Sequence, residues 1–115
     1  MGIAYHRLLY QASLNSGDAM SLSDALDLGE HGALHLVVTV ESAGNADDTG
    51  KLIVQHAAVN ASGRYLDFLT PIEVPLNATG TTWLCADEFT RWVAWSVTGD
   101  LSSPAVVTVD LLAKS

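Results

Sequence analysis

The chain has 115 residues, which is enough for one domain with a single hydrophobic core. Hydrophobic residues make up 49% of it, yet no segment approaches the ~18 consecutive apolar residues of a membrane helix, so the apolar surplus indicates both a core and a subunit interface. The net charge of −8, with only 5 Lys and Arg, argues against nucleic acid and anionic membranes as partners, because both attract clustered cations.

The first 30 residues form an N-terminal arm that we set apart from a core domain over residues 31–115. The segments YHRLLYQAS and AMSLSDALDL each predict a strand, with a short helix capped by Ser21 or Ser23 as the alternative for the second. The arm also holds four residues of types that are frequent in interfaces, namely Tyr5, Arg7, Leu9 and Tyr10. It therefore either pairs with an open sheet edge of a neighbouring molecule or forms the first strand of its own domain.

Apolar and polar residues alternate through the middle of the chain. The segment ALHLVVTVE predicts a strand, whose apolar face consists of Leu34, Leu36, Val38 and Val40. A turn-rich loop, SAGNADDTG, separates it from a second predicted strand, KLIVQHAAV. The tight turn NASG and the segment RYLDFL then complete a predicted hairpin with that strand.

Three further strands are predicted near the C-terminus, at TTWLCA, RWVAWSV and AVVTVDLLA. In the first, we expect Cys85 to be a small buried hydrophobe and Trp83 to face inward or to seal an edge. Seven or eight short strands with frequent turn signals predict an all-β, single-domain antiparallel β-sandwich or jelly roll.

The segment RWVAWSV contains two tryptophans three residues apart, which a strand places on opposite faces. We expect Trp95 to lie in the core with Val93 and Val97. Trp92 then lies on a face of small residues, where it is part-exposed and either contacts another protein or lies under a neighbouring loop.

The polar residues do not form a recognisable catalytic or metal-binding pattern. Asp47 and Asp48 share a turn-rich loop that lacks the alternating ligands of an EF-hand. His35 and His56 could meet on adjacent strands, but spacing supplies no third ligand for zinc, and the single Cys85 excludes a disulfide within the chain. There is no nucleophile elbow, phosphate loop or dinucleotide fingerprint. We therefore predict no catalytic residue, no metal, no cofactor and no enzymatic activity.

Four motifs follow one another between residues 33 and 114. They are Gln55-His56 at a strand end, the turn Ala78-Thr79-Gly80, the RWVAWSV strand, and a final alternating strand over residues 106–112. With these motifs the chain resembles small virion proteins of tailed bacteriophages and prophages. It departs from their pattern over residues 57–63, where Val59 extends an apolar run in place of a Ser-x-Asp-Gly turn, and in its first 30 residues.

This resemblance implies a non-enzymatic structural protein of the phage particle, a capsid decoration or cement protein that binds the major capsid protein on the virion surface and is made in the host cytoplasm. It also implies a homo-oligomer, with a trimer favoured. Such a protein works by multivalent contacts, for which the expected interface residues are Tyr5, Arg7, Leu9, Tyr10 and Trp92. Two alternatives remain, a tail or baseplate adaptor and a carbohydrate-binding module, the second of which requires several exposed aromatic rings on one face.

Overall fold

The computed structural model describes residues 3–29 and 31–115, and almost all of its regular structure is β-strand. A single turn of 3-10 helix covers Leu22–Asp24. The eight strands are β1 (Ile3–Leu14), β2 (Leu26–Asp27), β3 (Ala33–Ser42), β4 (Lys51–Ala57), β5 (Ile72–Pro75), β6 (Gly80–Ala86), β7 (Trp92–Thr98) and β8 (Ala105–Lys114).

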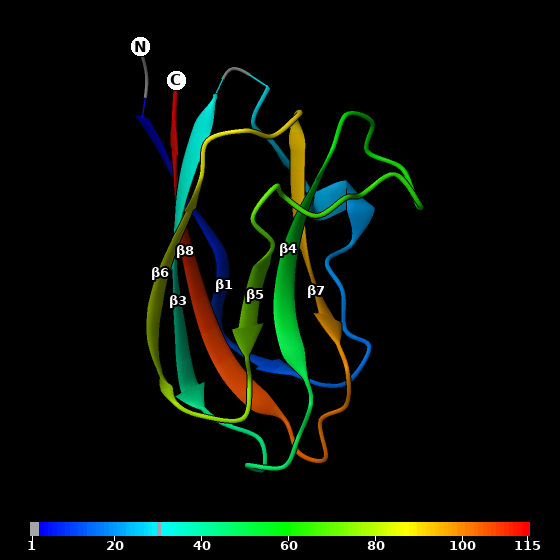
Figure 1. The fold of residues 1–115 in the computed structure, drawn as a ribbon, viewed down its shortest axis with the longest axis vertical. Coiled ribbons are helices and arrows are strands. Elements are labelled where there is room, and N and C mark those ends of the chain that lie inside the picture. Colours follow the sequence, from blue (N-terminus) through cyan, green and yellow to red (C-terminus); the bar gives the residue numbers. More distant parts are fainter. Residues whose placement is uncertain (1–2, 30) are drawn as a thin grey trace.

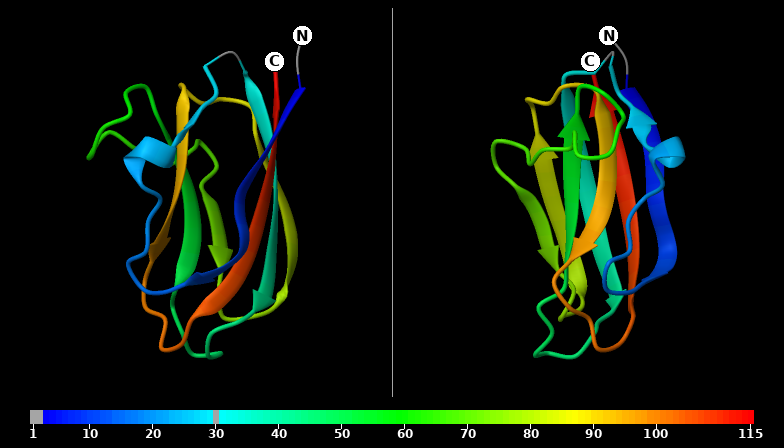
Figure 2. Two further views of the ribbon diagram at one scale, coloured as in Figure 1. Left: turned by 180° about the vertical axis from the view of Figure 1, so that it is seen from behind. Right: turned by 90° about the vertical axis from the view of Figure 1, so that its right-hand side faces the viewer.

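The strands form two antiparallel four-stranded sheets that pack face to face (Figures 1 and 2). One sheet has the strand order β1-β8-β3-β6 and the other has the order β2-β7-β4-β5. In both sheets, strands that are distant in sequence lie side by side, which is the arrangement of a jelly roll. The predicted all-β sandwich with a single domain is confirmed.

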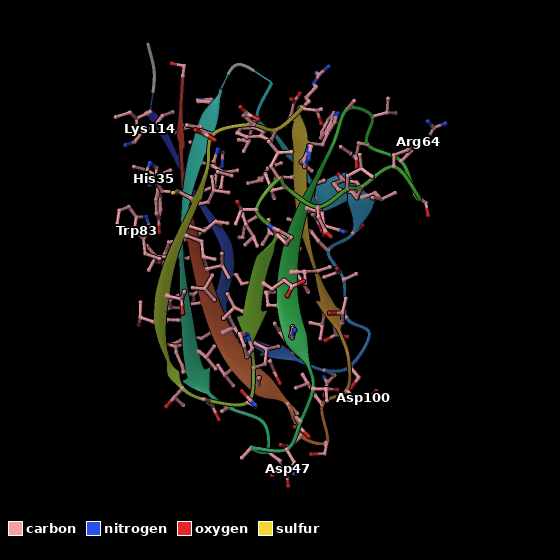
Figure 3. All side chains as sticks on the ribbon, in the orientation of Figure 1. His35, Asp47, Arg64, Trp83, Asp100 and Lys114 are labelled. Atoms are coloured by element: carbon pink, nitrogen blue, oxygen red, sulfur yellow. The ribbon has the colours of Figure 1, made fainter. Side chains whose placement is uncertain are left out.

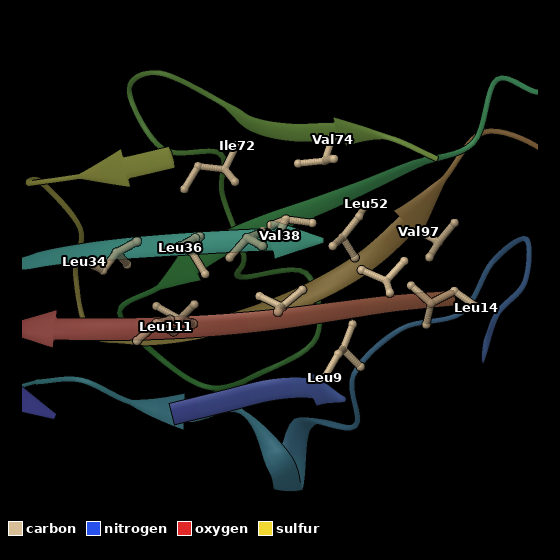
Figure 4. Packing of buried hydrophobic residues seen from close by; sticks show 14 of the residues in the cluster. Leu9, Leu14, Leu34, Leu36, Val38, Leu52, Ile72, Val74, Val97 and Leu111 are labelled. Atoms are coloured by element: carbon tan, nitrogen blue, oxygen red, sulfur yellow. The ribbon is translucent and has the colours of Figure 1, made fainter. Parts of the chain in front are cut away.

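The core lies between the two sheets and consists of the side chains that point inward from the strands (Figure 4). The predicted apolar face of β3 is confirmed, because Leu34 and Leu36 are fully buried and Val38 and Val40 nearly so. On the neighbouring β8, every second residue from Ala105 to Ala113 is likewise buried. Successive side chains of a strand point to opposite faces, so each strand has one face in the core and one face at the surface.

The N-terminal arm supplies β1, which pairs with β8 of the same chain from Ile3 opposite Lys114 to Leu14 opposite Ala105. The pairing shifts register between residues 7 and 12, where Gln11 adopts a left-handed conformation with φ of 44°. The Gln11 amide donates a hydrogen bond to the Thr108 hydroxyl, so the irregularity is held in place by β8. Residues 1, 2 and 30 of the arm lie outside the described residues.

The segment AMSLSDALDL contains both kinds of element that the sequence allowed. The 3-10 turn follows Ser21, whose side chain makes no capping hydrogen bond, and β2 then pairs with the start of β7. Before the turn, Ala19 forms an isolated bridge with Ser96. This segment therefore lies along the exposed edge of β7.

The predicted strand RYLDFL is wrong. Residues 58–70 form a loop whose backbone meets β4 in one isolated bridge, between His56 and Leu66. The strand that pairs with β4 on the side away from β7 is β5. In the loop only Phe68 is buried, whereas in β5 both Ile72 and Val74 are. The short segment IEVP thus fills the core better than the longer segment RYLDFL, because its alternation matches the pleat.

The expected opposite orientation of the two tryptophans of β7 is confirmed. Trp95 packs against the core beside the buried Val93 and Val97, although its ring is only partly buried. Trp92 lies on the other face and is also partly buried. The Arg91 guanidinium lies 5.3 Å from the centre of the Trp92 ring, so this ring is covered by a charged side chain.

We predict that Leu36→Ala lowers the free energy of unfolding by about 2–5 kcal/mol, because it opens a cavity between the sheets. The adjacent Val37 points out of the same strand and is 38% exposed, so Val37→Ala should cost less than about 1 kcal/mol. Urea unfolding of both variants at low protein concentration checks the difference. Equal losses would show that the alternation of β3 is misassigned.

Candidate functional site

The outward side of the β1-β8-β3-β6 sheet brings together residues from four strands. In one row across the sheet Tyr5 lies opposite Leu112, which lies opposite His35, and in the next row Asp110 lies between Arg7 and Val37. β6 adds Cys85 and Trp83 to these two rows, and Ile3 and Lys114 pair beside them. We call this surface the outer sheet face, and its members are Ile3, Tyr5, Arg7, His35, Val37, Trp83, Cys85, Asp110, Leu112 and Lys114.

The outer sheet face exposes large apolar side chains. Ile3 and Trp83 are each 69% exposed, Tyr5 is 56% exposed and Val37 is 38% exposed. Isolated exposed hydrophobes are common, but several on one sheet face make a patch of the kind that contacts another molecule. The apolar surplus in the composition is therefore partly on this surface.

Two expectations about β6 are wrong. Of the two positions expected for Trp83, the inward one is wrong, because this residue is 69% exposed on the edge strand β6. Cys85 is exposed rather than buried. The cause is the place of β6 at the edge of its sheet, with Leu84 and Ala86 turned towards the core and the residues between them turned towards solvent. Periodicity alone leaves open which of two alternating faces is buried, and here the face with the tryptophan is the outer one.

The Trp83 ring does not project freely into solvent but lies against His35 of β3 (Figure 3). The two rings are stacked, with centroids 5.8 Å apart and planes at 17°. The indole N–H donates a hydrogen bond of 3.2 Å to His35 Nδ1. This contact holds the indole in one orientation, while Trp83 as a whole stays 69% exposed.

Three polar groups form a network on the same face. Arg7 and Asp110 make an ion pair of 2.9 Å, and the Tyr5 hydroxyl donates a hydrogen bond to the same carboxylate. The hydrogen bond from Tyr5, followed by that from Arg7, lowers the pKa of Asp110 below its ordinary value. The bond to Asp110 in turn raises the pKa of Tyr5. The network neutralises its own charges and leaves the apolar rings around it accessible.

The five predicted interface residues are distributed over three environments. Tyr5 and Arg7 belong to the outer sheet face, and Tyr10, 60% exposed, lies beside it with its ring centre 4.7 Å from the Arg7 guanidinium. Leu9 instead belongs to the core, because the register shift in β1 turns it inward. Trp92 lies on the opposite sheet. Sequence reasoning missed Trp83, the most exposed aromatic ring of the described residues.

The aromatic rings of the outer sheet face do not form one stacking platform. Trp83 and Tyr5 lie on the two edge strands, β6 and β1, with β3 and β8 between them. Three strand spacings separate such positions by about 14 Å. The rings are therefore two separate contact points on a broad surface.

The histidines expected on adjacent strands lie in different sheets, His35 on β3 and His56 on β4. The described residues contain no cluster of three or more potential metal ligands. In the acidic loop, Asp48 accepts hydrogen bonds from the backbone of Asn45 and from both the backbone and the hydroxyl of Ser102. The bond from the Ser102 hydroxyl is the main reason that the pKa of Asp48 is lowered. This carboxylate thus ties two loops together.

A cavity of about 390 Å³ is lined by Asp27, Gly29, His31 and Arg91. Its charged groups pair with one another, since Arg91 donates two hydrogen bonds of 2.8 and 2.9 Å to the Asp27 carboxylate. Those bonds lower the pKa of Asp27. The arrangement fixes the start of β7 beside β2.

Among the described residues, no helix is both long and apolar enough to cross a membrane.

No family model and no curated protein matches this sequence. The fold is similar to a solved structure of Bacillus endospore appendages, described as a novel family of disulfide-linked pili. The superposition has a TM-score of 0.54 with 8% sequence identity and covers 98% of this chain and 88% of that chain. At this identity the likeness establishes a shared fold.

The expectation of a phage capsid decoration protein is wrong. The protein with the similar fold belongs to a family of bacterial pili and not to a phage particle. The motifs behind the phage resemblance are alternating strands and small-residue turns, and a jelly roll of any function needs both. Residues 57–63, where the chain departed from the phage pattern, belong to the end of β4 and to the loop that replaces the predicted hairpin strand.

We predict that Tyr5→Phe raises the pKa of Asp110 towards its ordinary value, because the hydrogen bond that lowers this pKa most is removed. An NMR titration of the Asp110 carboxyl group measures this, and Tyr10→Phe on the same strand is the control. Because the folded pKa is lowered, the stabilisation by Asp110 is present above the unfolded pKa of about 3.9 and disappears as the pH falls through the folded value. An unchanged Asp110 pKa in Tyr5→Phe would contradict the network.

Proposed function

We propose that this chain is a non-enzymatic structural subunit of an appendage-like protein polymer, in which copies of the chain bind one another through the outer sheet face. The main observation in support is that this face exposes four large side chains to solvent, namely Ile3, Tyr5, Val37 and Trp83. Apolar and aromatic surface of this kind is typical of the centre of protein interfaces. The other sheet presents no comparable row, because Trp92 is covered by Arg91 and the segment before β2 runs along β7.

The fold of the Bacillus appendage protein supports this proposal. A protein of similar fold is there part of a pilus, so a domain of this kind can serve as a repeating unit. At 8% identity the contacts between subunits of that pilus do not carry over to this chain. The exposed side chains of the outer sheet face support the proposal by themselves.

The distribution of charge also favours self-association at this face. The whole chain carries a net charge of −8, so two copies repel each other over most of their surfaces. The outward side of this sheet is close to neutral, however, because the cations Arg7 and Lys114 offset the acids Asp110 and Glu41. A second copy can approach here without bringing two strongly acidic surfaces together.

Covalent linkage of subunits is limited in this chain by its single cysteine. One thiol allows one disulfide per subunit, which joins two copies but cannot extend through a row of them. Cys85 is exposed at the edge strand β6, so such a pair is sterically possible. A polymer of this chain must therefore be held mainly by non-covalent contacts, unlike one described as disulfide-linked.

The absence of a recognisable catalytic arrangement in the sequence is consistent with a structural role. The largest charged cluster of the outer sheet face is neutralised internally by the contacts of Asp110 with Arg7 and Tyr5. The acidic loop uses Asp48 to bind Asn45 and Ser102. These polar groups therefore have hydrogen-bond partners within the chain, as a structural role requires.

We predict that the purified protein forms species larger than a dimer as its concentration rises, seen by light scattering and negative-stain electron microscopy. Trp83→Ala should raise the concentration needed by roughly thirtyfold or more, because central aromatic residues contribute most of the binding free energy. Trp83→Phe, which keeps an aromatic ring, should restore part of the affinity. Melting curves of both variants confirm that the fold is retained.

Assembly should persist in reducing buffer and in Cys85→Ser, because the contacts are non-covalent. A wild-type protein that remains monomeric at every soluble concentration would contradict the proposed function. Assemblies that dissolve completely on addition of reductant would show that the disulfide, and not the outer sheet face, holds the subunits.

A further inference from the structure

The strand β6 presents a free hydrogen-bonding edge on the side away from β3. In Figure 1 it lies at the margin of the molecule, and β3 is its only neighbour in the sheet. In an antiparallel ladder alternate residues direct their N–H and C=O groups to one side, so about half of these groups of β6 point outward. Among the described residues, no backbone hydrogen bond other than those of the β3 ladder involves Gly80–Ala86. The partner that fits such an edge is another β-strand.

The side chains of β6 leave this edge uncovered. The Trp83 ring turns towards β3, where it stacks on His35. The Thr81 hydroxyl is likewise hydrogen-bonded to that of Thr39 on β3, and the first four residues of β6 are all exposed. Another segment comes near only at the far end of β6, where the loop before β5 lines a cavity of about 70 Å³ with Cys85. Most of the edge is therefore accessible to a second strand.

β6 is the least protected of the four strand edges in the sandwich. Natural sheets protect their edges with short strands, charged residues, proline or bulges. β2 has only two residues, and β5 contains Glu73 and Pro75. β1 carries Arg7 and a register shift near Gln11. β6, in contrast, runs for seven residues without a charge, a proline or a break in its register with β3, so it lacks the features that prevent pairing.

Acidic residues directly after β6 favour one orientation for a second copy of this strand. Asp87 and Glu88 are both exposed there. Two copies of β6 in parallel would place these carboxylates side by side, in a chain whose net charge is already −8. An antiparallel pair instead sets the carboxylates of each copy beside the uncharged residues 78–80 of the other. The edge is therefore complementary in charge to an antiparallel copy of itself.

We propose that β6 pairs antiparallel with β6 of a second copy, about a two-fold axis at Trp83, and joins the two sheets into one continuous sheet. Thr81 then lies opposite Cys85 of the second copy, and Trp83 lies opposite its own counterpart. This register pairs all seven residues of both strands. The two indoles become cross-strand neighbours at the centre of the contact, and aromatic pairs of this kind stabilise antiparallel sheets.

This inference rests on the proposed function for the larger assembly and adds a second kind of contact to it. A contact of one outer sheet face with another is isologous, so by itself it closes at a dimer. Pairing through β6 leaves the outer sheet faces of both copies on the same side of the joined sheet. Each copy then has two different contacts, which allow growth beyond a dimer.

Disulfide formation between two single-cysteine proteins tests this register. One is the wild-type chain, with Cys85 alone, and the other is the isotope-labelled variant Thr81→Cys/Cys85→Ser. In the proposed pair the introduced thiol lies opposite Cys85 of the wild-type chain, with about 5 Å between Cα atoms, which a disulfide can span. Like residues lie about 13 Å apart along the strands, beyond that reach.

After mild oxidation of the mixture, mass spectrometry measures the mixed dimer and the two homodimers. The mixed dimer should exceed each homodimer by roughly tenfold or more, whereas random collision gives about a twofold excess. An excess of either homodimer would place like residues opposite one another and would overturn the inference.

The cross-link reports on edge pairing separately from the proposed function. Contact between two outer sheet faces does not produce it, because packed sheets lie about 10 Å apart and a disulfide needs Cα atoms within about 7 Å. If wild type assembles but the mixed dimer forms only at the random ratio, the inference is overturned and the proposed function stands. If the mixed dimer is favoured but wild type never grows beyond a pair, the proposed function is overturned and the edge contact stands.

Two controls separate specific pairing from chance encounters and from misfolding. Ser62→Cys/Cys85→Ser carries its thiol on the exposed loop beside Arg64, which Figure 3 shows on the opposite side of the molecule from Trp83, and should give only the random ratio. Melting temperatures of the variants should match wild type, because the exchanged residues are exposed.

Hydrogen exchange of the wild-type chain provides a second measurement that needs no substitution. The amides of β6 that point away from β3 should exchange more slowly at assembling concentrations than in dilute solution, because a second strand then accepts their hydrogen bonds. Unchanged exchange of these amides in the assembled protein would overturn the inference, even if the cysteine variant fails to fold.

Discussion

The structure depends on the double pairing of β8, which hydrogen-bonds to β1 on one side and to β3 on the other. Its inward residues, from Ala105 to Ala113, form the centre of the core. The same pairing fixes which outward residues become neighbours, so Asp110 lies between Arg7 and Val37. Burial of one face of β8 therefore determines the composition of the other face, which is where we expect a second molecule to bind.

Much of the fold follows from alternation in the sequence, since β3, β7 and β8 are long and have a clear apolar face. The sequence is less informative where segments are short or at an edge. The sequence pattern favours RYLDFL over the four-residue strand β5, because local composition does not reveal which segment fits the core. The exposure of Trp83 depends on β6 being an edge strand, and strand order is a property of the whole topology.

The candidate site was predictable only in part, again because strand order and register depend on the whole topology. Tyr5 and Arg7 were recognised as interface types, but their neighbours come from the opposite end of the chain. Leu9 was misplaced because a register shift in β1 reverses its direction, and no residue type signals such a shift. The error about phage capsids has a related origin, since strand and turn patterns report the fold, and one fold serves unrelated functions.

The pairing of the two chain ends has a consequence for biosynthesis. Ile3 lies opposite Lys114, so β1 cannot find its full partner until the residues up to Lys114 have been made. Domains dominated by such distant pairings fold slowly, commonly in milliseconds to seconds. The outer sheet face combines Tyr5 with Leu112, and it therefore does not exist on a nascent or C-terminally truncated chain. Synthesis through β8 thus acts as a checkpoint, and only a chain that contains both β1 and β8 presents the surface through which copies are proposed to join.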